Sequence, residues 1–120
     1  MQLPLFPLHV VAFPRLPLPL HVFEPRYRAM TRELLRDGSP YRGRFVVAMI
    51  AAGREHESAD PGEATLQPVG TICQVRRADR FADGRFALLA VGVERAALGV
   101  VDRSGPYAVV EAMCEWSTDG

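Results

Sequence analysis

The types of reactive side chain in the sequence limit the chemistry that this chain can perform. The 120 residues contain no lysine, and all fourteen basic side chains are arginines. A Schiff base, a Ser-Lys dyad and the phosphate-binding lysine of a Walker A loop are therefore excluded. Fourteen acidic residues balance the arginines, so no overall field attracts nucleic acid or an anionic membrane.

Metal ligands and catalytic triads are also poorly supported. None of the histidines has a cysteine or carboxylate at zinc-ligand spacing, and neither cysteine belongs to a C-x-x-C pair; these residues are His9, His21, His56, Cys73 and Cys114. The run HES at 56–58 holds three triad residue types, but adjacency in sequence is not triad geometry. We predict no metal, no cofactor and no catalytic residue, and hence no enzyme.

The two cysteines carry a prediction of their own. Cys73 and Cys114 lie far apart, each within an apolar run. Such cysteines are typical of buried free thiols in a reducing compartment.

The proline-rich start lacks the charged region of a signal peptide, and no stretch approaches the roughly 20 apolar residues of a membrane span. We expect a soluble, cytoplasmic protein.

The first 25 residues contain six of the ten prolines. Prolines favour short extended segments and edge positions over central strands, because they lack a backbone N–H. We expect strands at Leu3–Phe6 and Leu18–Phe23, connected by Val10–Phe13, and no central strand in this region.

One helix is predicted over about residues 25–37. Pro25 suits the first helical position and Gly38 the C-terminal cap. Glu24 is expected to cap the helix with its side chain and to pair with Arg28 one turn later; the same place would also suit contact with a ligand.

Four strand segments follow the helix. Phe45–Ala52 reads as a strand buried on both faces, and 53–68 as a loop. Val69–Arg77 and Arg85–Glu94 are predicted to form a hairpin around the Asp83-Gly84 turn, and Tyr107–Trp116 a last strand. The order indicates one mainly β or α+β domain, partly closed as a barrel.

Several of these segments resemble a known family. LPLFPL at 3–8, HVFEPRYR at 21–28, VGT at 69–71, VGVER at 91–95 and PYAVVE at 106–111 are similar, in order and spacing, to the Lon N-terminal (substrate-binding) domain family, and most of all to its small stand-alone members. The resemblance implies a PUA-like pseudo-barrel of six strands with the FEPRYR helix packed at one end.

The chain departs from the family pattern in three places. Arg15 stands where the family usually has glycine, and ERAALGVV at 94–101 replaces the commoner strand sequence after the hairpin. Family members also continue into a helical bundle beyond the position of Gly120. We therefore expect residues 1–120 to form a single domain, with the bundle absent or truncated.

The resemblance further implies a non-catalytic module that recognises unfolded or extended polypeptide in protein quality control. The candidate contacts are Leu16, His21, Phe23 and Tyr41; for each one, packing in the core is the competing interpretation. A second set of residues forms the structural signature of the family: Phe23, Glu24, Pro25, Arg26 and Tyr27. Exposed apolar residues near Met113 and Trp116 would suit a homodimer.

RNA binding is the alternative from another class, because PUA-like folds include RNA-binding members. Arg28, Arg32 and Arg36 would form one basic stripe, and Arg76, Arg77, Arg80 and Arg85 a second cluster. RNA recognition usually adds exposed aromatic rings, and the rings near these arginines are few and diluted by acidic neighbours. We expect neither nucleic acid nor a membrane as the partner.

Overall fold

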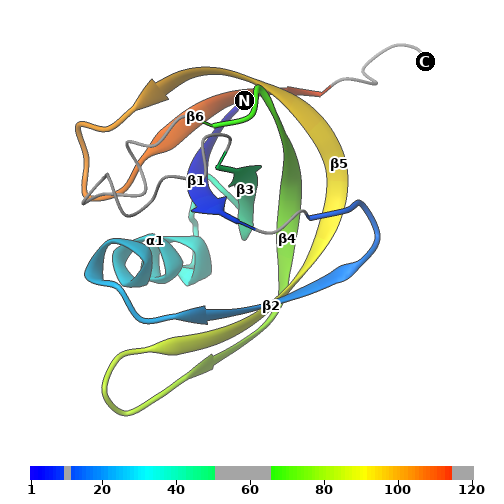
Figure 1. Cartoon of the computed structure of the whole chain (residues 1–120). Helices are drawn as coiled ribbons and strands as arrows, with labels where there is room; N and C mark the ends of the chain where they lie inside the picture. The colour runs from blue at the N-terminus through cyan, green and yellow to red at the C-terminus, as the bar shows by residue number, and fades with distance from the viewer. Residues whose placement is uncertain (10–11, 51–65, 115–120) are drawn as a thin grey trace.

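The computed structural model describes residues 1–9, 12–50 and 66–114. These residues form six strands and one helix (Figure 1), in the order β1 (Gln2–Leu8), β2 (Pro17–Val22), α1 (Pro25–Leu35), β3 (Arg44–Met49), β4 (Val69–Arg80), β5 (Phe86–Asp102) and β6 (Val109–Cys114). The predicted mainly β fold with one main helix is confirmed.

The strands close into a ring. They follow the order β2-β5-β4-β3-β1-β6, and an additional pairing between β5 and β6 joins the far end back to the middle. Five strands therefore form the closed ring, while β2 pairs only with the first part of β5. Figure 1 shows the strands curving around a common interior, with β2 and α1 outside it.

Two apolar clusters hold this arrangement together. One cluster takes residues from all five ring strands and none from α1 or β2, so it fills the interior; Leu5, Val46, Ile72 and Val110 belong to it. The other cluster lies between the ring's outer face, β2 and α1. Alternate residues of β3 belong to the two clusters, since Val46 points inward and Val47 points outward. The buried strand predicted at Phe45–Ala52 is thus confirmed at 44–49.

Helix α1 packs on the outer cluster through Tyr27, Met30 and Leu34. Pro25 occupies its first turn as predicted, but two details of the prediction were wrong. The Glu24 side chain makes no capping hydrogen bond, and only the Glu24 backbone carbonyl accepts the Arg28 N–H, at 2.9 Å. The helix ends at Leu35, so Gly38 (φ +81°) serves instead the Arg36–Ser39 turn beyond it.

The prediction that the proline-rich start forms no central strand was also wrong. β1 lies between β3 and β6, yet its two partners divide its length: Gln2–Pro4 pair with β6, and Leu5–Leu8 pair in parallel with β3. Pro4 and Pro7 each face a single paired neighbour, so the missing N–H can point to the side without a partner. Of the predicted connector Val10–Phe13, residues 10–11 lie outside the described residues.

The β4–β5 hairpin is confirmed and is longer than predicted. Phe81 and Arg85 close its turn, where the Phe81 N–H donates to the Arg85 carbonyl at 2.8 Å, and Gly84 takes a φ of +93°. The last strand, β6, covers 109–114 of the predicted Tyr107–Trp116, and Trp116 lies outside the described part of the chain. The predicted loop at 53–68 falls largely outside it as well, at 51–65.

Arg15 and Gly92 mark a close crossing of two segments. Arg15 adopts a φ of +73°, and its N–H donates to the Gly92 carbonyl at 2.7 Å. A Cβ at Gly92 would overlap the Phe13 carbonyl oxygen, so only glycine lets the segment before β2 pass over β5 at this point. The turn is therefore built with arginine at the strained position and glycine opposite it.

Candidate functional site

The end of β2 and the tip of the β4–β5 hairpin bring three aromatic side chains together. The His21 ring lies 5.7 Å from the Phe23 ring and 6.3 Å from the Phe81 ring, measured between centroids. Phe23 is 58% exposed and Phe81 is 41% exposed. We call His21, Phe23 and Phe81 the aromatic surface. Both phenylalanines thus lie near His21, and exposed apolar side chains gathered in this way can mark an interaction site.

Arg85 holds the aromatic surface in place. Its guanidinium carbon lies 5.3 Å from the centroid of the Phe81 ring, and Nη1 lies 3.3 Å from Nε2 of His21. Since a guanidinium is only a donor, Nε2 of His21 is the acceptor in this contact.

The hairpin tip is itself fixed. The Asp83 carboxylate accepts hydrogen bonds from the Arg85 N–H at 3.1 Å and from Arg85 Nε at 2.7 Å, and these bonds lower the pKa of Asp83. Arg28 of α1 donates to the Asp83 carbonyl at 2.7 Å. A side chain at Gly84 would collide with the Arg28 guanidinium. Helix and hairpin are therefore tied together, and the aromatic surface rests on a rigid base.

An apolar pocket of about 310 Å³ adjoins the aromatic surface and shares His21 and Phe23 with it. Its other walls come from the end of β1, the proline-rich β2 and the start of α1, including Leu8 and Pro19. Tyr27, stacked on Phe6 with 4.4 Å between ring centroids, forms its floor. Glu24 supplies the charged part of the rim. The pocket suits apolar side chains of a partner.

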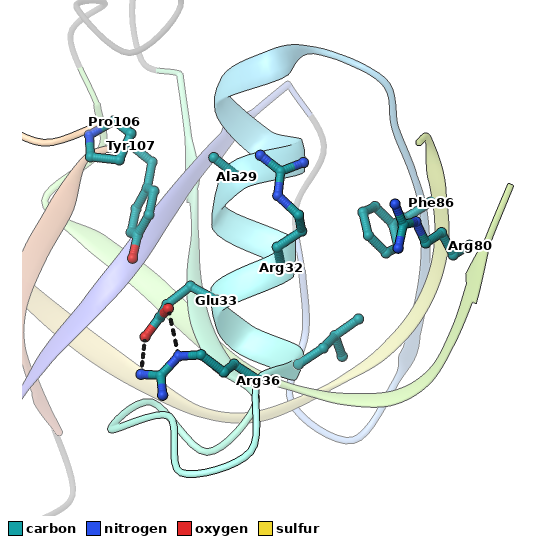
Figure 2. Close-up of a pocket in the computed structure, with 9 residues that line it drawn as sticks. Ala29, Arg32, Glu33, Arg36, Arg80, Phe86, Pro106 and Tyr107 are labelled. Carbon is teal, nitrogen blue, oxygen red and sulfur yellow. Dashed lines mark hydrogen bonds and ion pairs between the residues drawn. The ribbon is translucent and has the colours of Figure 1, made fainter. Parts of the chain in front are cut away.

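A second and wider groove, of about 690 Å³, crosses the exposed side of α1. Figure 2 shows Arg32 and Ala29 on the helix, with Pro106 and Tyr107 to one side and Arg80 and Phe86 to the other. Burial, and then the neighbouring hydroxyl of Tyr41, raise the pKa of Tyr107. We call this feature the arginine groove.

The four candidate contact residues divide into two groups. His21 and Phe23 lie together in the aromatic surface. Leu16 is exposed, but it precedes β2 whereas Phe23 follows that strand, so the two are separated by the length of the strand. Tyr41 is half-buried and packs against both apolar clusters. The structure therefore brings two of the four predicted contacts into one site.

The residues of the signature block F-E-P-R-Y at 23–27 are partly buried and partly exposed. Pro25 starts α1, Tyr27 is buried, and the Arg26 guanidinium lies 6.0 Å from the centroid of the Tyr27 ring. Phe23 and Glu24 are exposed. Sequence reasoning missed Phe81 and Arg85 as parts of a polypeptide-binding site, although the hairpin pairing predicted from Asp83-Gly84 already placed them at its tip.

The free edge of β2 is a poor template for an added strand. Its other edge is occupied by β5, and Pro17 and Pro19 have no N–H to donate to a new neighbour. Contacts through side chains on the aromatic surface and in the apolar pocket are better supported than strand addition.

Reactive groups do not converge in the part of the chain that the structure describes. No group of three metal-binding side chains occurs within residues 1–9, 12–50 and 66–114. Cys73 and Cys114 are free thiols; Cys73 is buried as predicted, and Cys114 is only half-buried. Burial raises the pKa of Cys73 to about 12, which makes it unreactive. No helix in the described ranges has the length and apolarity of a membrane span.

Comparison with known proteins gives consistent results. The family model described as "ATP-dependent protease La (LON) substrate-binding domain" matches residues 2–120. Lon protease 2 of Syntrophobacter fumaroxidans is 29% identical over 89% of this chain, and the Lon protease of Anaeromyxobacter dehalogenans is 30% identical over 92%. The chain spans only 13% of the length of each of these proteases.

Solved structures are similar in fold. A Lon N-terminal domain protein from Xanthomonas campestris aligns with a TM-score of 0.71 and 30% identity, over 95% of this chain and 59% of that one. The N-terminal domain of the Mycobacterium avium complex Lon protease aligns with a TM-score of 0.68 and 17% identity, over 100% of this chain and 57% of that one. At that identity, the second likeness concerns the fold alone.

Proposed function

Because the chain belongs to the LON substrate-binding domain family, we propose that it is a non-catalytic module that binds unfolded or extended polypeptide and serves protein quality control. The observation that carries the proposal is the aromatic surface: two exposed phenylalanines beside an apolar pocket, on elements fixed by Arg28 and Arg85. Rigid exposed rings bind apolar segments at little cost in conformational entropy.

The chemistry of the site agrees with a role in binding. Among the described residues that form the aromatic surface and line its pocket, no nucleophile is paired with a base, and the sequence has no lysine. The free thiols of Cys73 and Cys114 support a reducing, cytoplasmic location, which belongs to the same proposal.

RNA binding is less well supported. Three of the arginines that would contact phosphate are engaged by acidic neighbours: Arg36 by Glu33, Arg77 by Asp79, and Arg85 by Asp83. A labelled RNA whose affinity exceeds that of polypeptide and falls steeply with added salt would favour this alternative.

The test uses a double variant. Phe23→Ser with Phe81→Ser should weaken binding of a carboxymethylated, permanently unfolded model protein by at least about tenfold, since each buried phenylalanine contributes roughly 1.5–3 kcal/mol. Val100→Ser is the matched control, because Val100 is 82% exposed and lies outside the site. Fluorescence anisotropy gives the affinities and circular dichroism confirms folding. A folded wild-type domain that binds neither this protein nor a random peptide library would refute the proposal.

A further inference from the structure

We infer that the arginine groove binds an acidic residue of the polypeptide, so that the domain favours apolar segments carrying a carboxylate. This inference rests on the proposed function and names the class of segment that is preferred. It concerns a surface separate from the aromatic surface, although the β4–β5 hairpin contributes to both through the consecutive residues Arg80 and Phe81.

The groove combines an apolar base with charged walls. Phe86 is almost fully buried beneath it, while Leu35 and Pro106 offer exposed apolar surface. Ala29, on the exposed side of α1, leaves the middle of the groove open (Figure 2). Its volume of about 690 Å³ has room for more than one side chain of an extended segment.

The charges around this base are unbalanced. Arg32, Arg36 and Arg80 line the groove, and Glu33 is the one acidic residue among the described residues that line it. Arg36 neutralises Glu33 by donating from Nε to Oε1 at 3.0 Å and from Nη2 to Oε2 at 2.7 Å, which lowers the pKa of Glu33. The pair is drawn as dashed lines in Figure 2.

Arg32 and Arg80 remain as two positive charges without an ion-pair partner in the described part of the chain. They stand on different elements, α1 and β4, and both line the groove. The complementary ligand is therefore anionic and flanked by apolar groups. An aspartate or glutamate within an apolar segment has this composition.

A nucleic acid fits the groove less well. Binding of single strands needs exposed ring faces on which bases can stack. Phe86 is 4% exposed, and Tyr107 is half-buried. The remaining apolar surface of the groove is aliphatic, which suits side chains of a polypeptide.

The experiment compares two labelled peptides that differ only in charge: an apolar peptide containing aspartates, and the same peptide with asparagines. The wild-type domain should bind the aspartate peptide roughly five- to tenfold more tightly, and the difference should shrink with added salt. The double variant Arg32→Glu with Arg80→Glu should abolish or invert the preference. Arg76→Glu, with Arg76 exposed on β4 outside the groove, is the control for a charge change elsewhere and should preserve it.

The outcomes separate the two proposals. If both peptides bind equally and the groove variant changes nothing, the inference is wrong while the proposed function stands. If neither peptide binds to the folded domain, both fail. If the Arg76 variant removes the preference as fully as the groove variant, the effect is one of net charge and the inference is wrong. The same follows if an RNA oligonucleotide displaces the aspartate peptide and binds more tightly.

Discussion

Arg15 adopts a strained backbone conformation that glycine would adopt more easily. Its φ of +73° lies in the left-handed region, which costs a side-chain-bearing residue about 1–2 kcal/mol. A glycine at this position would avoid that cost. The arginine is tolerated because the segment is anchored on the other side by Gly92.

Arg15→Gly should therefore stabilise the domain. The relief of strain is offset in part by the greater freedom of glycine in the unfolded chain, which leaves a gain of about 0.5–1 kcal/mol in the free energy of unfolding. Urea denaturation measures it. Ala97→Gly, at a position of β5 that is paired with Val69 on one side and Met113 on the other, is the control and should destabilise. A loss of stability on Arg15→Gly would show that the Arg15 side chain makes a compensating contact.

The Cys73 thiol should make the free energy of unfolding depend on pH in the alkaline range. Burial raises its pKa from 9.0 to about 12, so between these values the unfolded chain has lost the thiol proton while the folded chain keeps it. The free energy of unfolding should then fall as pH rises through this range. Cys73→Ala should remove this part of the decline and leave the part due to Tyr107, whose pKa is also raised. Urea denaturation at pH values from about 8 to about 11 gives the slope of the free energy of unfolding against pH for the wild type and for Cys73→Ala. Equal slopes for the two proteins would contradict the assignment.

At the scale of elements, the bond from Arg28 to the Asp83 carbonyl joins α1 to the hairpin that carries Phe81. Arg28→Ala should loosen the hairpin tip, because it removes the hydrogen bond that joins α1 to the Asp83 carbonyl. Amide exchange at 81–85 should become roughly five- to tenfold faster. Binding of unfolded polypeptide should weaken with it, because the aromatic surface loses its fixed base.

Arg76→Ala, which removes an exposed arginine from β4, should leave both exchange and binding unchanged. If Arg28→Ala speeds exchange without weakening binding, the rigidity of the hairpin does not matter for recognition. Unchanged exchange would mean that the hairpin holds its shape without the helix.

The elements that sequence predicts well are the local ones. Pro25 specifies the start of α1, and Asp83-Gly84 specifies the hairpin. Both patterns act over a short stretch of chain, so no distant partner is needed to interpret them.

Elements that depend on distant partners were predicted less well. β5 runs to Asp102 rather than Glu94 because it exchanges one neighbour, β2, for another, β6. A bulge between Leu98 and Val101 interrupts its alternation there. The candidate site shows the same limit: Phe23 was predicted from the signature block, whereas Phe81 joins it only through the pairing of β2 with β5.

At the scale of the whole molecule, ring closure brings the two ends of the described chain together, since Gln2 pairs with Glu111. This closure supports our proposal that residues 1–120 act as a single domain. The exposed side chains of Val100 and Met113 lie on the β5 and β6 side of the ring, away from the aromatic surface. The homodimer stays a prediction for that side, and it would leave the site open.

Mapping the contact surface by nuclear magnetic resonance tests the central claim most directly. Titrating the ¹⁵N-labelled domain with a permanently unfolded polypeptide should shift the amide signals of residues 21–24 and 81–85 first and most strongly, since these residues carry the aromatic surface. Signals around Val100 and Met113 should stay in place. Shifts confined to the β5 and β6 side, or none at saturating polypeptide, would contradict the account.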